Sequence, residues 1–72
     1  MMPEINLELI KQQRKAKKYT MQYMADHLKL NNPSAYQRRE SGEYKFQAVE
    51  IYALSNLLGI PMEKIFVKKL PK

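Results

Sequence analysis

Residues that begin or end helices recur along this chain, and they confine every helix to a few turns. Thr20 favours a helix start, because its hydroxyl can accept a hydrogen bond from an N–H of the first turn. Pro33 and Pro61 suit the start of a helix, where the missing N–H costs nothing. Gly42 and Gly59 suit the left-handed conformation that follows a last turn. The sequence therefore predicts short helices joined by tight turns.

The apolar residues between these breakers recur three and four positions apart, which is the period of a helix buried along one side. In the first predicted helix this stripe consists of Leu7, Ile10, Arg14 and Lys17. In the fourth predicted helix it consists of Ala48, Ile51, Leu54, Ser55 and Leu58. We predict no strand and five helices: residues 7–18 behind an N-cap at Asn6, two or three turns behind Thr20, residues 33–40 behind an N-cap at Asn32, residues 48–58, and a short segment from Pro61. The predicted core is Leu7, Ile10, Tyr19, Met24, Ala25, Leu28, Leu30, Tyr36, Ile51, Leu54, Leu58, Ile65 and Phe66.

The length of 72 residues allows one core, because a chain of this size buries only about 60% of the surface that it exposes when unfolded. We predict a single domain over residues 1–72, with its folded part in residues 6–66 and a basic tail in residues 67–72. Val67 and Leu70 in that tail offer a contact for self-association.

Three features of the composition indicate a protein of a reducing cytoplasm. The chain has no cysteine, so it forms neither a disulfide nor a thiolate metal site. Its start carries Glu4 where a signal peptide needs positive charge, and no apolar run reaches 18 residues. The sequence indicates neither export nor a membrane span.

The charge is strongly basic, with 13 Lys and Arg against 7 Asp and Glu, a net charge of +6. Excess positive charge favours association with a polyanion, above all a nucleic acid. Solubility alone is the alternative explanation for a charge of this size.

Two short helices joined by a tight turn, the second of them polar along its outer side, are typical of a helix-turn-helix that places its second helix in a DNA major groove. The chain also resembles the Cro/cI-type, XRE-like helix-turn-helix regulators of temperate phages over about residues 6–66. The residues that carry the resemblance are Arg14, Tyr19-Thr20, Met24-Ala25, Leu28, Tyr36, Glu40-Ser41-Gly42, Leu58-Gly59-Ile60-Pro61 and Ile65-Phe66. It implies an all-α, five-helix lambda-repressor-like domain that regulates transcription in the lysis/lysogeny switch of a phage, in the cytoplasm of a bacterial host, without cofactor. Double-stranded DNA is the implied partner. A homodimer is a possible form of the protein that binds it.

The resemblance also implies roles for particular residues. Arg14 and Glu40 take the positions of a structural ion pair between the first and third helices. The implied base-reading residues are Pro33, Ser34, Gln37 and Arg38. Contacts to the DNA backbone fall to the lysines of the first helix and to Thr20, Gln22, Tyr44 and Lys45. Arg39 stands where an apolar residue is frequent, so we expect a packed stem and a solvated head; Arg38 and Arg39 as mere phosphate contacts are the alternative.

Several positions depart from this pattern and open a second hypothesis. Met21 stands where a glutamine is frequent, and Glu43 and Phe46 follow Gly42 where basic residues are frequent. The surface made by Met21, Tyr23, Glu43, Tyr44 and Phe46 suits contact with a protein. The target would be the DNA-facing surface of a partner repressor, and the chain is similar to the small modulators of repression, or anti-repressors, of phages as well. That these side chains are ordinary core or scattered surface residues is the alternative.

Other classes of function have little support in the sequence. His27 stands alone beside Asp26, and no serine has a visible base or oxyanion donor near it, so neither an enzyme nor a metal site is predicted. The lysine-rich first helix needs its apolar stripe for the core, which argues against a helix lying on a membrane.

Overall fold

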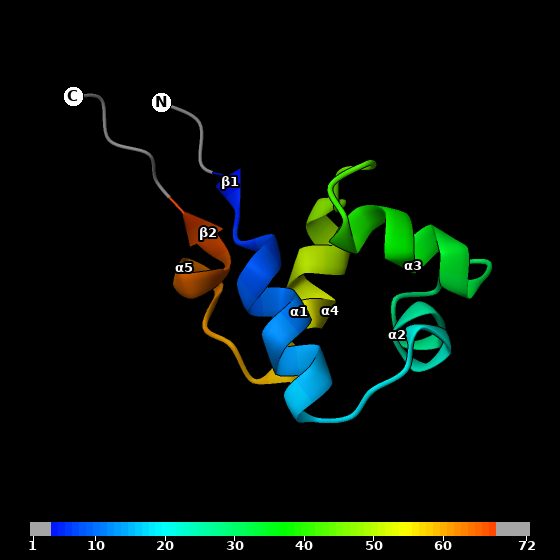
Figure 1. The fold of residues 1–72 in the computed structure, drawn as a ribbon. Coiled ribbons are helices and arrows are strands. Elements are labelled where there is room, and N and C mark those ends of the chain that lie inside the picture. Colours follow the sequence, from blue (N-terminus) through cyan, green and yellow to red (C-terminus); the bar gives the residue numbers. More distant parts are fainter. Residues whose placement is uncertain (1–3, 68–72) are drawn as a thin grey trace.

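The computed structural model describes residues 4–67, and within them it has five helices and one short antiparallel strand pair (Figure 1). The elements are β1 (Glu4–Ile5), α1 (Leu7–Ala16), α2 (Met21–His27), α3 (Pro33–Glu40), α4 (Ala48–Leu58), α5 (Met62–Ile65) and β2 (Phe66–Val67). The all-α class with five helices is confirmed. Val67, which we assign to the tail, forms part of β2. The other residues of the predicted tail, 68–72, including Leu70, lie outside the described residues.

The helix starts follow from local capping, as the sequence predicts. Asn6 Oδ1 accepts from the Leu9 N–H at 3.1 Å, and Thr20 Oγ1 accepts from the Tyr23 N–H at 3.0 Å. Asn32 does the same for the first turn of α3. Each cap satisfies a donor that a helix leaves unpaired at its N-terminus.

The C-terminal ends of α4 and α1 can be compared with the ends that the sequence predicts. Gly59 follows α4 with a φ of 67°, in the left-handed region that costs glycine nothing. Helix α1 ends at Ala16, earlier than predicted, and Lys17 is exposed as its C-cap. The predicted extension of the buried stripe to Lys17 is therefore wrong, and so is the burial of Ala48, which is exposed at the first position of α4.

The prediction of no strand is wrong. Ile5 pairs with Phe66 and Glu4 with Val67 in an antiparallel pair, and the Asn6 N–H continues it by donating to the Ile65 carbonyl at 2.7 Å. Two residues per strand are too few to give a period in the sequence. Their pairing depends on the fold, which brings the segments before α1 and after α5 side by side (Figure 1).

The core contains eleven buried apolar residues among those described: Ile10, Met24, Ala25, Leu28, Tyr36, Phe46, Ile51, Leu54, Leu58, Ile60 and Ile65. Four residues that we assign to the core from sequence pack against its edge and are only half-buried: Leu7, Tyr19, Leu30 and Phe66. Phe46 and Ile60 belong to the core, although they are absent from the core predicted from the sequence.

Helix α1 lies at the centre of the fold and contacts α3, α4 and α5 (Figure 1). Helices α2 and α3 pack on one another at one end, and α5 with the strand pair lies at the other. No helix within residues 4–67 combines the length and the apolar character that a bilayer span requires.

Candidate nucleic-acid interface

A buried ion pair fixes α3 against α1. Arg14 donates to Glu40 twice, from Nε at 2.8 Å and from Nη2 at 3.1 Å, with only 9% and 5% of the two side chains exposed. Arg14 Nη1 also donates to the Tyr19 carbonyl at 3.0 Å, and the Tyr36 hydroxyl donates to Glu40 Oε2 at 2.7 Å. The hydrogen bond to Glu40 raises the pKa of Arg14, so the guanidinium stays charged. The network joins α1, the segment before α2 and α3 to one another.

The anchoring of Tyr36 and Glu40 determines which side of α3 faces outward. Both are buried, and since they are four positions apart they share the inner side of the helix. Ser34, Gln37 and Arg38 are exposed and share the opposite side at helical spacing. Pro33, at the first position of the helix, is half-buried. Three of the four candidate base-reading residues, Ser34, Gln37 and Arg38, are therefore accessible to a ligand together.

Arg38 is held near the C-terminal end of α3 by the loop that follows. Its guanidinium lies 5.7 Å from the centre of the Tyr44 ring, and its Nε lies 4.0 Å from Glu43 Oε2. The Arg38 carbonyl accepts from the N–H groups of Glu43 and Tyr44, which folds the loop back onto the helix. Both charged side chains are more than half exposed, so the contact orients Arg38 while leaving it open to solvent.

Arg39, the next residue, has a different role from the one that the sequence suggests. Its Nε donates to Glu50 Oε1 at 2.9 Å and its Nη1 donates to the Ala35 carbonyl at 2.9 Å. Glu50 is buried and also accepts from the Gln47 N–H, which closes the capping box of α4. The expected solvated head is wrong, because the guanidinium compensates a buried carboxylate. Arg39 joins α3 to α4 and is not available for a phosphate.

Phe46 is not part of an exposed partner surface. Only 8% of it is exposed, and its ring lies 6.1 Å from that of Tyr36 within the core. The prediction that it contacts a partner protein is wrong, because the loop after Gly42 turns this side chain inward. The other candidate partner residues differ: Glu43, Tyr23 and Tyr44 are exposed. Met21 is half-buried.

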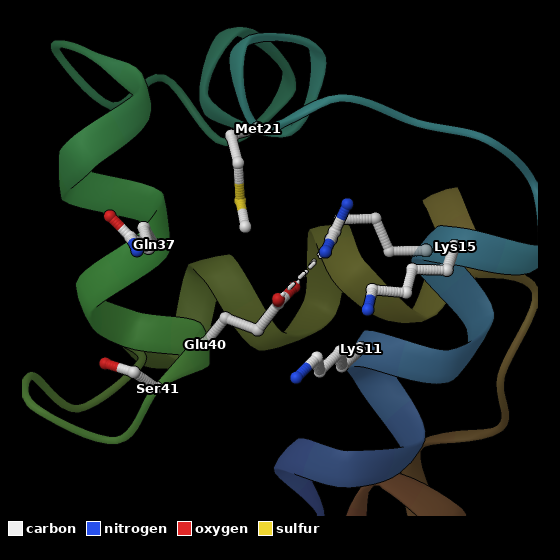
Figure 2. Close-up of a pocket in the computed structure, with 7 residues that line it drawn as sticks. Lys11, Lys15, Met21, Gln37, Glu40 and Ser41 are labelled. Carbon is white, nitrogen blue, oxygen red and sulfur yellow. Dashed lines mark hydrogen bonds and ion pairs between the residues drawn. The ribbon is translucent and has the colours of Figure 1, made fainter.

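A pocket of about 290 Å³ opens between α1, the first residue of α2 and the C-terminal half of α3 (Figure 2). Its lining residues are Lys11, Arg14, Lys15, Met21, Gln37, Glu40 and Ser41. Lys11 and Lys15 reach into it from α1, while Gln37 and Ser41 border it from α3. Since Glu40 neutralises Arg14, the two lysines make the pocket cationic. A cationic hollow beside the exposed side of α3 suits a phosphate oxygen.

A comparison with protein-family models matches residues 10–65 to the family described as Helix-turn-helix. The chain belongs to the helix-turn-helix family. The comparisons with curated proteins and with solved structures gave no match. The family match extends from within α1 to the end of α5, and it makes the protein an XRE-like, DNA-binding regulator of transcription. The match assigns no enzymatic activity to the domain.

In this helix-turn-helix, α2 is the first helix and α3 the second, joined by the turn at residues 28–32. The other candidate contacts to the DNA backbone lie in or next to these two helices. Thr20, Gln22 and Lys45 are exposed, but Thr20 Oγ1 already caps α2, and Gln22 Nε2 donates to Asp26 at 2.8 Å. Lys45 follows Tyr44 in the loop. Ser41 also lines the pocket, although no local pattern in the sequence marks it.

His27 of the helix-turn-helix is an exposed residue whose Nδ1 lies 3.0 Å from the Tyr23 carbonyl oxygen. Its ring stacks on Tyr23, with 4.1 Å between the ring centres. Among residues 4–67, no group of three or more His, Cys, Asp or Glu side chains is placed to hold a metal ion.

Proposed function

We propose that this regulator occupies an operator through α3 and that it does so in a phage-type lysis/lysogeny switch, in the cytoplasm of a bacterial host. The observation that carries the operator-binding proposal is the exposure of Gln37 and Arg38 beside the inward anchors Tyr36 and Glu40. The resemblance to temperate-phage regulators supports the phage setting. Repression follows if the operator overlaps a promoter.

Arg38 is the principal base-reading residue in this proposal. Its guanidinium fork matches the O6 and N7 acceptors of guanine in the major groove, and the Tyr44 ring orients the fork before DNA arrives. Gln37 and Ser34 add weaker contacts to base edges. Pro33 opens the helix without an N–H and leaves room for the approach of the duplex.

Phosphates of the DNA backbone supply the larger part of the affinity. A backbone phosphate lies over the pocket, where Lys11 and Lys15 neutralise it. Further contacts come from Thr20, Gln22, Tyr44 and Lys45. Two copies of the domain bind two half-sites about 34–36 Å apart, one turn of the double helix.

Selection from a random duplex library by the purified protein tests this function. We expect one sequence to be enriched, and we expect affinity for it to fall steeply with salt as phosphate contacts release counterions. Binding without enrichment, or no binding at low salt, contradicts operator recognition.

Capture of a partner repressor is the second candidate function. The pocket contains the Met21 thioether, which offers a phosphate nothing, and Glu43 adds a carboxylate next to Arg38. Apolar and acidic groups on this side suit the basic DNA-facing surface of another regulator, with Tyr23 and Tyr44 as further contacts. Light scattering of the protein mixed with a candidate repressor tests this function: a 1:1 mass favours capture, and two unchanged masses contradict it.

A further inference from the structure

The outer side of α4 is an exposed apolar face without a single charge. Val49 is 76% exposed and Tyr52 is 63% exposed, and Asn56 continues their side one turn later. Ala53, half-buried, borders the same side next to Val49. The one charged residue of α4 is Glu50, and it is buried against Arg39 on the other side. In a chain with 28% charged residues, this helix presents an apolar surface to solvent.

The charge of the molecule leaves this uncharged face as the surface where a second copy of the same chain can approach. Each copy carries +6, so two copies repel one another across any surface that holds the lysines and arginines. Two α4 faces meet without moving a charge of either helix face out of water, which removes the cost of desolvating charges from this contact.

The order of side chains along α4 is also complementary to itself. In an antiparallel pair with the two-fold axis between positions 52 and 53, Tyr52 lies against the second copy's Ala53, and Val49 against the second copy's Asn56. A large side chain thus meets a small one twice, as close packing of two helices requires. We propose that two copies of this protein pair through Val49, Tyr52, Ala53 and Asn56 of α4 around such an axis.

The size of the face makes this pairing weak in solution. Two turns of one helix bury less than the roughly 800 Å² per partner of a stable complex. Two copies on neighbouring half-sites of one duplex are held at a high effective concentration, so the same contact then acts strongly. This second step depends on the proposed operator binding, whereas the weak pairing in solution does not.

Sedimentation equilibrium without DNA tests the face, at protein concentrations from about 10 µM to about 1 mM, the range of a weak interface. We expect Val49→Glu to weaken self-association at least about tenfold, because it places two carboxylates at the interface. Gln12→Glu on the exposed side of α1 makes the same charge change and is expected to keep the wild-type association. Both variants lower the net charge, so general repulsion explains no loss. A monomer throughout, or association that Val49→Glu retains, overturns the proposal.

Cross-linking gives a second readout in a chain that has no cysteine of its own. Helices packed closely about an axis bring residues near it within the 4.4–6.8 Å that a disulfide requires between Cα atoms. We expect Ala53→Cys to oxidise to a covalent dimer several times faster than Ala16→Cys on α1, an exposed alanine replaced in the same way. Equal rates overturn the proposal. A dimer through position 53 together with no selected duplex sequence overturns operator binding and leaves the α4 interface standing.

Discussion

The guanidinium of Arg14 grips the carboxylate of Glu40 across 26 positions of sequence, with Nε at 2.8 Å from Oε2 and Nη2 at 3.1 Å from Oε1. Glu40 is the last residue of α3, and it also accepts from Tyr36 one turn earlier. The inner side of α3 is thereby fixed to α1. The outward direction of Gln37 and Arg38 follows from this anchoring.

Removal of Glu40 should destabilise the whole domain. Glu40→Ala leaves the Arg14 guanidinium buried without a counter-charge, at an expected cost of about 3–5 kcal/mol in the free energy of unfolding. Urea denaturation measures it. Glu43→Ala, which removes an exposed carboxylate three residues further on, is the control and should cost less than about 0.5 kcal/mol. Equal stability of the two variants contradicts the structural role of the pair.

Arg39 should matter for stability and not for DNA. Arg39→Ala leaves Glu50 buried with the Gln47 N–H as its remaining donor, and we expect a loss of about 1–3 kcal/mol in the free energy of unfolding. Affinity for duplex DNA, measured at a temperature where the variant is folded, should stay close to that of the wild type. A large loss of affinity in a folded Arg39→Ala protein contradicts the assignment of this side chain to the interior.

The two glycines in left-handed conformations should differ in their response to alanine. Gly42 has a φ of 92°, and a Cβ there would lie 3.2 Å from Leu7 Cδ1. Gly59 has a φ of 67° and open space around the same position. We expect Gly59→Ala to lower the free energy of unfolding by about 1 kcal/mol and Gly42→Ala by more, because strain and crowding combine. Thermal melts give the order, and the reverse order contradicts the packing of Leu7 on this turn.

Stability should fall at alkaline pH through Tyr36. Burial, and next the hydrogen bond to Glu40, raise the pKa of Tyr36 above its ordinary value of 10.0. Below pH 10 both the folded and the unfolded states keep the proton, and the stabilisation is fully present. Above it the unfolded state releases the proton first, so the free energy of unfolding falls by about 1.4 kcal/mol per pH unit for this group.

Urea denaturation of wild type and Tyr36→Phe between pH 9 and pH 12 checks this contribution. The phenylalanine variant is less stable at neutral pH, because it loses the bond to Glu40, but its decline above pH 10 should be shallower. If the free energy of unfolding falls equally with pH in the two proteins, Tyr36 does not make this contribution.

Local signals in the sequence predict the helices well. The side chains of Asn6, Thr20 and Asn32 cap the helices that they precede, because a cap depends only on the residues three positions on. Gly59 ends α4 for an equally local reason.

Features that depend on contacts between distant segments could not be predicted from the sequence. The pairing of Arg39 with Glu50 requires α4 to cross α3 at one register, and the burial of Phe46 requires a loop to turn inward. The pairing of Arg14 with Glu40 follows from the resemblance to a family and not from any pattern of spacing in the sequence. The pocket joins three helices, so its lining with Ser41 has no sequence signature.

The lysines of α1 should control the salt dependence of DNA binding. Lys11→Gln and Lys15→Gln each remove one expected phosphate contact, so each should reduce the slope of log affinity against log salt concentration by about 0.9. Lys64→Gln on α5 makes the same charge change at the other end of the fold and should leave the slope unchanged (Figure 1). Equal slopes for all three variants contradict the binding of a DNA phosphate at the pocket.

The Arg38→Ala variant decides whether α3 reads DNA with its exposed side. Equilibrium titration compares wild type and variant on the duplex selected from a random library and on a scrambled duplex at the same salt concentration. We expect the variant to lose about 1–3 kcal/mol of its preference for the selected duplex, with a much smaller change on the scrambled one, and to unfold like the wild type. An unchanged preference in the Arg38→Ala protein contradicts base reading by α3.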